Sequence, residues 1–501
     1  MERKVISRNI ISSILLQFVT ILSGFIVPKV ILSYFGSNVN GLISSINQFL
    51  NYIQLLEGGL SGVIMSALYR PLAEGDNEAI SRVIKAAQQF FKKIACIFVV
   101  YMLVVAFVYP AFVKTGYSYT YSLILVIVLG SHLFVQYFFA LSWKLLLNAD
   151  RKVYIVSVTQ IAIVILNVIA VIVCSRLFQD VLIIKIASAA IYLIQPIIYG
   201  TYVKKHYNID PHAEPDNRAL EQRWSGFGIN LAYFVHTNTD VAILTLFSTL
   251  VNVSVYSVYL MVVNAMKNLV ISVSAAIMPS FGKVIVSESR ENANRKFELY
   301  EFGIFFITTI IFTCGLFLIT PFIRVYTANI HDANYEQYIF GYLLVLAEMA
   351  YCYRDSYVSA SYAAGHFRQV TKYAVIEVII NLALSLTLVH SLGIVGVAIG
   401  TLVSMIYRGI AHVFYLRENI LYRNPLIALK KMLVFGSTVA LIMLLSGMLL
   451  NDRAAGYLQW FILAFEEMFI CFTVTCMVSF VFFRNDFMEL LRNTVLRKMR
   501  K

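Results

Sequence analysis

The sequence has few charged residues and few prolines for its length. Charged residues make up 13% of the 501 residues, and nine residues are proline. Such low charge excludes an ordinary soluble domain, in which about a quarter of the residues are charged. The six cysteines show no Cys-x-x-Cys spacing, so no zinc or thiol redox motif is present. No Gly-Lys-Ser or Gly-Lys-Thr motif is available to hold a nucleotide phosphate, and we expect neither metal nor cofactor.

Apolar residues, by contrast, make up 59% of the chain and recur in long runs. A bilayer core of about 30 Å needs roughly 20 apolar residues as a helix, and lipid offers backbone amides no water. The sequence therefore predicts an all-α polytopic membrane protein with about fourteen transmembrane helices. The expected spans are 10–34, 41–69, 94–113, 119–147, 153–174, 181–203, 225–247, 253–281, 298–320, 338–364, 370–391, 393–416, 432–450 and 457–483.

Positive charge is concentrated on alternate sides of these spans. Most of the 40 lysines and arginines lie near the two termini and in 69–93, 144–152, 204–223, 283–296 and 417–431. Because cytoplasmic loops carry an excess of Lys and Arg, both termini are expected to be cytoplasmic. The net charge of +13 is then explained by attraction to anionic lipid, and no nucleic-acid partner is expected.

A weak internal repeat divides the chain. Residues 30–40 align with 242–252, at an offset of six spans. Six is an even number, so the halves share one orientation, as in transporters built from parallel repeats. The predicted organisation is a six-helix lobe at 1–203, a cytoplasmic linker at 204–224, a second six-helix lobe at 225–416, and two helices with a basic cytoplasmic tail at 417–501.

Two segments at the expected inner surface are amphipathic. In 76–93, Asp76 can cap a helix with one apolar face, and 484–501 has a similar pattern. Both are interpreted as interfacial helices, with regulatory or partner-binding helices as the alternative. The expected outer loops, such as Phe35–Asn40 and 321–337, are too short for a folded catalytic domain.

Several spans contain ionisable or strongly polar residues. Such groups are costly in hydrocarbon and are expected to face protein or a water-filled path. The candidates for binding substrate are Lys29, Asn264, Lys267, Arg354 and Arg408. The candidates for coupling to an ion are Glu57, His236, Asp240, Glu348 and Asp355.

Structural roles remain open for some of these residues. Arg354 can pair with Glu348 or Asp355 inside the bundle. Arg408 lies within reach of the inner surface, so its side chain can snorkel to water. His236 can be a packed, neutral histidine.

Several short motifs stand out in the two halves of the chain. In the N-terminal half these are Tyr34-Phe35-Gly36, Asn40-Gly41-Leu42, Leu56-Glu57-Gly58-Gly59-Leu60 and Ala67-Leu68-Tyr69-Arg70-Pro71-Leu72-Ala73-Glu74-Gly75-Asp76. Further along the chain are Thr239-Asp240 and Val255-Tyr256-Ser257. Together these motifs resemble the polysaccharide transport family of the multidrug/oligosaccharidyl-lipid/polysaccharide exporter superfamily.

The resemblance implies a flippase of the bacterial cytoplasmic membrane. Such a protein moves undecaprenyl-diphosphate-linked oligosaccharide units from the inner to the outer leaflet, for capsule, O-antigen or exopolysaccharide synthesis. The resemblance also implies two lobes around a cavity that opens to alternate sides, with Lys29 and Lys267 facing the diphosphate. The last two helices, within 432–483, would form a groove for the prenyl tail. The expected partners are the lipid-linked oligosaccharide, membrane lipids, and the glycan polymerase and chain-length machinery.

Two other functions remain open. A multidrug-type cation-coupled antiporter of the same superfamily usually has twelve spans, and the additional pair here argues against it. A membrane glycan polymerase or ligase would need a large outer loop with catalytic residues, which this sequence lacks. The sequence therefore favours a transporter that is not an enzyme.

Overall fold

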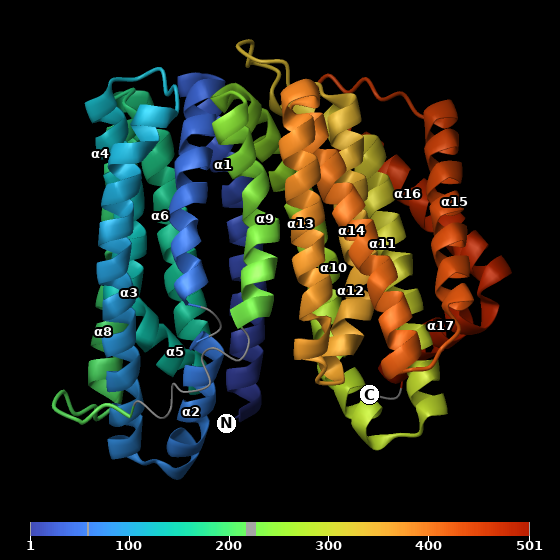
Figure 1. Ribbon diagram of the computed structural model, residues 1–501, viewed down its shortest axis with the longest axis horizontal. Helices are drawn as coiled ribbons and strands as arrows, with labels where there is room; N and C mark the ends of the chain where they lie inside the picture. The colour runs from blue at the N-terminus through green and yellow to red at the C-terminus, as the bar shows by residue number, and fades with distance from the viewer. Residues whose placement is uncertain (1, 58–59, 217–226, 500–501) are drawn as a thin grey trace. The chain divides into compact units, whose positions relative to one another are not determined.

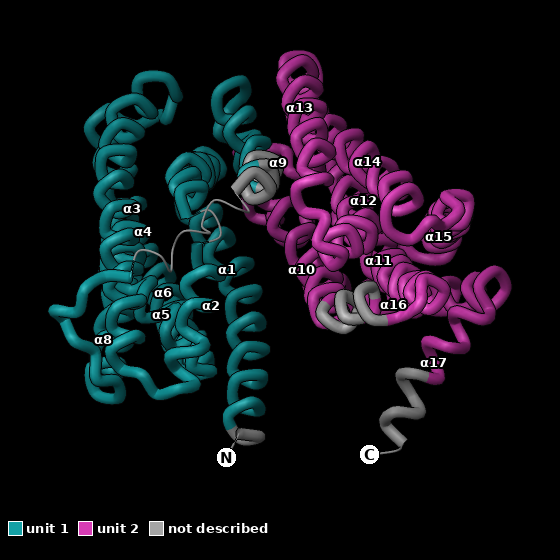
Figure 2. The backbone as a smooth tube through the Cα atoms, turned by 60° about the horizontal axis from the view of Figure 1, so that its bottom comes forward, with its two compact units in different colours: residues 1–254 teal, residues 255–501 magenta. Residues whose placement is uncertain are grey.

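Only helices and their connections occur in the part of the chain that the structure describes. The computed structural model describes residues 2–57, 60–216 and 227–499. Side chains are not described at 2–4, 227–230, 232–233, 235–237, 279–283, 285–287 and 493–499. The chain divides into two compact units, Met1–Ser254 and Val255–Lys501, which Figure 2 shows in different colours. This architecture confirms the predicted all-α fold class.

Unit 1 is a bundle in which α1 packs along α6 and α3 packs along α4 (Figure 1). Its core contains the fully buried Leu42, Ile46, Leu68 and Phe98. Its elements are α1 (Glu2–Asn51), the 3-10 helix η1 (Tyr52–Leu56), α2 (Leu60–Glu74), α3 (Asn77–Phe112), α4 (Tyr119–Val135), the π-helix η2 (Gln136–Ala140), α5 (Leu141–Ala149), α6 (Val153–Leu177), α7 (Val181–Tyr192), α8 (Ile194–His206) and α9 (Phe227–Phe247).

Unit 2 is built around α11, which packs against α12 on one side and against α15, α16 and α17 on another (Figure 1). The helix α14 packs between α12 and α13. The elements are α10 (Leu250–Ser287), α11 (Arg290–Tyr326), α12 (Tyr338–Ala363), α13 (Phe367–Leu392), α14 (Ile394–Asn419), α15 (Pro425–Leu449), α16 (Tyr457–Phe482) and α17 (Arg484–Met499). Because α10 begins before Val255, the boundary between the compact units lies within this helix. The lobe boundaries expected at 203 and 225 stay a prediction.

Eleven helices of the described chain are long and apolar enough to cross a membrane, against about fourteen predicted spans. Part of the difference arises because α1 counts once although it covers 10–34 and the start of 41–69. The described apolar part of α9 is only Asn238–Phe247, too short to count. The helix α12 carries three ionisable residues, which lower its hydropathy. The multi-pass architecture therefore agrees with the sequence. The number of spans differs because a continuous helix is counted once and because α9 and α12 do not meet the limits of length and hydropathy.

The helical segment α1 is broken at Gly36. The φ of 80° and ψ of −180° of this residue lie outside the helical region, so α1 consists of two helices joined at one residue. The prediction of an outer loop at Phe35–Asn40 was wrong, because helical structure continues on both sides of Gly36. Glycine adopts a positive φ without the steric cost that a Cβ atom would bring. A single residue thus replaces a loop.

Gly36→Ala is expected to destabilise the protein by about 1–3 kcal/mol, because alanine would have to hold this strained conformation. Gly24 provides a matched control in the same segment, since a Cβ atom there would meet no atom within 4 Å. Gly24→Ala is expected to raise stability by up to about 1 kcal/mol. The stability of both variants is measured as the temperature at which half of the monodisperse protein is lost. Equal midpoint temperatures for the two variants would contradict the strain at Gly36.

The helix α3 begins at the predicted cap. The Asp76 carboxylate accepts a hydrogen bond from the backbone N–H of Ala79 at 2.9 Å. The helix then continues without a break over Asn77–Phe112. The interfacial segment 76–93 and the span 94–113 are therefore one helix, because no glycine or proline separates them.

The two C-terminal spans, α15 and α16, have an apolar outer surface. Met448 is 81% exposed and Phe465 is 77% exposed. The inward face of α16 carries small and polar side chains, including the fully buried Cys471, Thr475 and Ser479. Small side chains allow helices to pack closely in lipid, where apolar burial gives no advantage. This distribution is typical of helices whose outer face contacts lipid.

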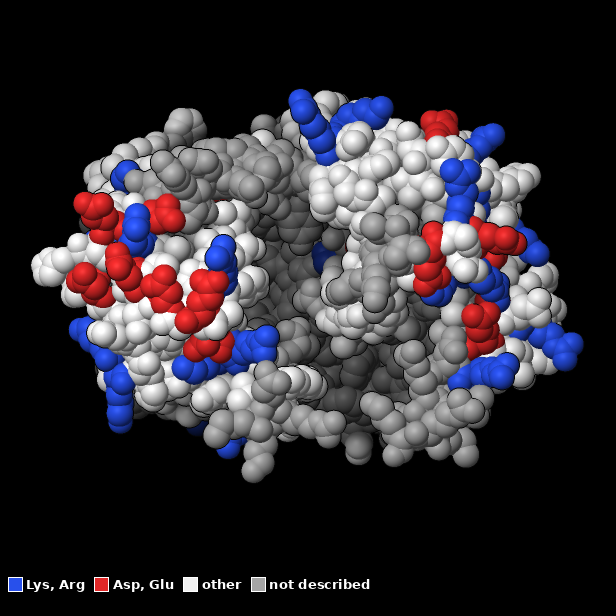
Figure 3. All heavy atoms as spheres, turned by 90° about the horizontal axis from the view of Figure 1, so that it is seen from below, with Lys and Arg blue, Asp and Glu red and all other residues white. Residues whose placement is uncertain are grey.

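Charged side chains gather at the helix ends of each unit. Figure 3 shows such ends, where lysine and arginine lie among aspartate and glutamate. On α2, Arg70 pairs with Glu74 at 2.8 Å. In unit 2, Arg295 of α11 pairs with Asp486 of α17 at 2.6 Å. Charge at helix ends and apolar surface between them are what a bilayer requires.

Candidate functional site: a charge network inside unit 2

Unit 2 contains charged side chains inside its helical bundle. They centre on α12, whose Glu348 and Arg354 are only 6% and 4% exposed. An ionisable group in hydrocarbon costs about 2.5–3.5 kcal/mol or more, so these side chains need partners. Their charged partners come from two neighbouring helices, α10 and α13.

Lys267 on α10 pairs with Glu348. The Lys267 Nζ atom lies 3.0 Å from Glu348 Oε2, and the two side chains are 12% and 7% exposed. The attraction is strong at this separation because the surroundings have a low dielectric constant. This ion pair connects α10 to α12.

Glu377 on α13 binds two guanidinium groups. Its Oε1 atom lies 3.3 Å from Arg354 Nη2, and its Oε2 atom accepts a hydrogen bond from Arg408 Nη1 at 2.5 Å. The Glu377 side chain is almost completely buried. Arg408, on α14, also donates a hydrogen bond to the Tyr362 hydroxyl at 3.2 Å. One carboxylate therefore holds α12 and α14 to α13.

The ring of Tyr351 connects these two sets of ion pairs. Lys267 Nζ lies 5.1 Å from the ring centroid, and Arg354 Cζ lies 4.4 Å from it. The face of a tyrosine ring attracts cations at such distances. The continuous set, called the charge network below, consists of Lys267, Glu348, Tyr351, Arg354, Glu377 and Arg408.

Asp355 adjoins the network but is held by hydroxyl groups. Ser274 Oγ on α10 donates to Asp355 at 2.6 Å, and Ser359 Oγ donates at 3.4 Å. Ser274 also shares a hydrogen bond with the Tyr300 hydroxyl at 2.7 Å. When Asp355 is counted with the network, three cations face three carboxylates. Protonation of any one carboxylate therefore leaves a net positive charge in the interior.

The structure corrects two expectations about pairing. Arg354 pairs with Glu377 and not with Glu348 or Asp355, because residues six apart, or adjacent, on a helix do not face each other. Arg408 is 5% exposed and bound to Glu377, so its side chain does not snorkel to the surface. The sequence candidates that the network brings together are Lys267, Glu348, Arg354 and Arg408.

The candidates in unit 1 occupy separate places. Lys29 is half-buried in α1, and Asp240 is buried in α9. Glu57, at the end of η1, accepts hydrogen bonds from Ser61 Oγ and from the Tyr137 hydroxyl, the latter at 3.4 Å. These three residues belong to unit 1 and are not part of the charge network.

Three further residues complete the comparison with the sequence. Asn264 is half-buried on α10, close to one turn before Lys267. The side chain of His236 lies outside the described residues. Glu377, which the sequence analysis missed, is the centre of the network. The criterion used for the other candidates, an ionisable residue inside an apolar span, identifies Glu377 when applied to 370–391.

Solved structures of other proteins have a similar fold. No protein-family model and no curated protein matches this sequence. The lipid II flippase MurJ, in an inward closed conformation, matches with a TM-score of 0.70 and 16% identity, over 94% of this chain and 99% of that chain. An inward-facing multidrug resistance MATE transporter of the MOP superfamily matches with a TM-score of 0.62 and 12% identity, over 79% and 94%. The MATE multidrug transporter DinF-BH, solved as a complex, matches with a TM-score of 0.58 and 15% identity, over 85% and 97%.

The identities are low, so these matches concern architecture. They agree with the all-helical composition and with the eleven membrane-length helices of the described chain. The chain is a multi-pass membrane protein with the fold that MurJ and the MATE transporters share.

Proposed function

We propose that this protein is a flippase for an oligosaccharide linked to undecaprenyl diphosphate. It moves the lipid-linked unit from the inner to the outer leaflet of a bacterial cytoplasmic membrane by alternating access, for capsule, O-antigen or exopolysaccharide synthesis. The observation that carries the proposal is the match to a lipid II flippase along almost the whole length of both chains. The motifs within 34–76 support an oligosaccharide unit as the cargo.

The C-terminal helices support a flippase over a multidrug antiporter. The MATE transporter of the MOP superfamily matches 79% of this chain while using 94% of its own length, whereas MurJ matches 94% of this chain. The C-terminal helices α15 and α16 expose apolar side chains. A lipid-linked sugar has a polar head that cannot cross hydrocarbon unaided and a tail that never needs to leave it. We assign α15 and α16 to the prenyl tail.

The charge network is assigned to the diphosphate and to ion coupling. Lys267 is neutralised by Glu348, so a diphosphate can bind Lys267 fully only when Glu348 releases it. Binding of a proton or cation at Glu348 would free this positive charge, and an ammonium group is a suitable partner for phosphate. Asp355, which is held by hydroxyl groups, is the second candidate for binding the coupling ion. The remaining candidates for these two roles are Lys29, Glu57, His236, Asp240, Asn264, Arg354 and Arg408.

Transport in liposomes tests the proposal. Purified protein is reconstituted with an undecaprenyl-diphosphate oligosaccharide that carries a fluorescent sugar, and a membrane-impermeant quencher is added outside. We expect the quenched fraction to rise with time relative to protein-free liposomes, without extrusion of the cationic dye ethidium. Dye extrusion without flipping would instead favour the cation-coupled antiporter.

The same purified protein and lipid-linked oligosaccharide also distinguish a transporter from an enzyme. We propose no catalytic activity, and a separate glycan polymerase with its chain-length machinery would use the flipped unit. The connection between α11 and α12, at 327–337, is short, which supports this view. Formation of new glycosidic bonds by the purified protein would contradict it and favour a polymerase or ligase.

Both termini are proposed to face the cytoplasm, which cysteine labelling can test. Glu214 is exposed between α8 and α9, and Asn329 is exposed between α11 and α12. In a background without the native cysteines, Glu214→Cys is expected to resist a membrane-impermeant maleimide added to intact cells. Asn329→Cys, the matched control, is expected to react. Labelling at 214 but not at 329 would reverse the orientation.

A further inference from the structure

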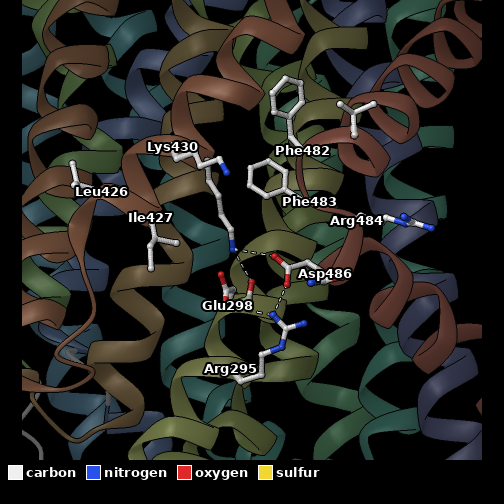
Figure 4. Close-up of a pocket in the computed structure, with 12 residues that line it drawn as sticks. Arg295, Glu298, Leu426, Ile427, Lys430, Phe482, Phe483, Arg484 and Asp486 are labelled. Carbon is white, nitrogen blue, oxygen red and sulfur yellow. Dashed lines mark hydrogen bonds and ion pairs between the residues drawn. The ribbon is translucent and has the colours of Figure 1, made fainter.

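A cavity of about 610 Å³ lies where α15 begins, α16 ends and α17 starts (Figure 4). It is called the α15–α17 pocket below, and α11 forms its floor. The residues that line it include Leu426, Ile427, Lys430, Val481, Phe482 and Arg484. Its volume is within the range of about 300–1,000 Å³ that is typical of small-molecule sites. It shares no residue with the charge network.

The charges on the floor of the pocket neutralise one another. Arg295 donates to Asp486 at 2.6 Å and to Glu489 at 2.6 Å. Lys431 pairs with Glu301 at 2.9 Å and lies 3.9 Å from Asp486. These interactions join α11, α15 and α17, and Figure 4 shows the contact between Arg295 and Asp486. The floor therefore fixes the shape of the pocket, and its cations are already paired with carboxylates.

The rim of the pocket carries two further cations. Lys430 and Arg484 are exposed and lie on either side of Phe483 in Figure 4. Within the described chain, neither forms an ion pair with a carboxylate. Their neighbours are aromatic rings: Lys430 Nζ lies 5.8 Å from the Phe483 ring centroid, and Arg484 Cζ lies 5.3 Å from that of Phe480. The rim can therefore accept an anion.

One wall of the pocket is apolar and open to the surroundings. Leu426, Val481 and Phe482 are 65%, 71% and 53% exposed. They belong to the ends of two membrane-length helices, so this wall lies where hydrocarbon meets the headgroup layer. A free anion would leave these apolar side chains uncovered, whereas a lipid would cover them with acyl chain. The combination of cationic rim and apolar wall matches an amphiphile.

We propose that the α15–α17 pocket binds an anionic phospholipid, with the phosphate between Lys430 and Arg484 and an acyl chain along Leu426, Val481 and Phe482. Basic pockets between helices at a membrane surface recognise anionic headgroups in this way. The bound lipid would hold the α16–α17 junction at the surface of the bilayer. The site shares no residue with the charge network that is assigned to the diphosphate.

Native mass spectrometry of the full-length protein, exchanged into mixed micelles of phosphatidylglycerol and phosphatidylcholine, tests the proposal. The wild-type protein is expected to retain phosphatidylglycerol selectively. Lys430→Gln/Arg484→Gln is expected to weaken this retention about 25-fold, a factor of about five for each basic residue near anionic lipid. Arg368→Gln/Lys372→Gln is the matched control, because it removes the same charge from exposed positions on α13. The control should retain phosphatidylglycerol as the wild type does.

Two further measurements decide the result even if the double variant does not fold. Lys430→Arg/Arg484→Lys should keep phosphatidylglycerol bound, and Val481→Trp should reduce retention by filling the acyl wall. Unchanged retention in the double variant or in Val481→Trp would overturn the proposal. It would also be overturned if inorganic phosphate alone stabilised the protein against heat as much as phosphatidylglycerol, which would indicate a free-anion site.

Discussion

Glu377→Gln is expected to prevent most of the protein from folding stably in the membrane. The amide preserves the shape of the side chain but removes the charge that neutralises Arg354 and Arg408. Breaking a buried ion pair by removing one partner costs about 3–5 kcal/mol, because the remaining charge stays buried without compensation. Fluorescence-detected size-exclusion chromatography of heated membrane extracts should show a lower midpoint and less monodisperse protein.

The control for this prediction is Glu466→Gln on α16, where the carboxylate is exposed and a change is expected to have little effect. A second comparison removes the stranded charges. Replacing the whole set, as in Glu377→Leu/Arg354→Met/Arg408→Met, is expected to recover folded protein, since apolar replacements of buried ion pairs are often neutral or stabilising. An unaltered midpoint for Glu377→Gln would show that the three side chains do not share one buried charge.

Lys267→Ala is expected to reduce flipping at least about tenfold while the protein still reaches the membrane. The change removes the cation assigned to the diphosphate and leaves Glu348 buried without its partner. A tenfold loss corresponds to about 1.4 kcal/mol of transition-state stabilisation. The liposome assay with the fluorescent lipid-linked oligosaccharide measures the rate, normalised to reconstituted protein.

The double variant Lys267→Ala/Glu348→Ala separates function from structure. Removing both partners leaves no unpaired charge, so folded protein should be recovered relative to Lys267→Ala. If the pair acts in transport, the double variant stays slow; if the pair only supports the fold, flipping returns to the wild-type rate. Arg453→Ala, which removes a positive charge from an exposed position, is the control and should flip normally.

The identity of the charged residues inside unit 2 was largely predictable from the sequence. Lys267, Glu348 and Arg354 are ionisable groups in long apolar runs, and the cost of leaving them in lipid required them to turn inward. Their pairing was not predictable. The pattern left Arg354 with two neighbours on its own helix, but the structure gives it Glu377 on α13. Side chains on one helix can pair only at suitable spacing, whereas partners on other helices depend on how those helices pack.

Arg408 shows the same distinction. Its position near the end of a span suggested that its long side chain reached water, which hydropathy alone permits. In the structure it is bound to Glu377, 31 residues earlier in the chain. Between the first two spans the sequence predicted a loop at Phe35–Asn40, whereas in the structure the single residue Gly36, at φ 80°, joins two helices.

The sequence by itself determined that this chain is an all-helical, multi-pass membrane protein, because lipid permits few structures other than helices for apolar runs of this length. It also determined local features such as the Asp76 cap, which depends only on neighbouring residues. Only the tertiary structure decided which cation meets which carboxylate, and that Glu377 joins three helices. The reason is that these contacts depend on the rotation and packing of α12, α13 and α14 against one another. A hydropathy pattern does not encode that arrangement, because the same apolar faces can pack in several ways.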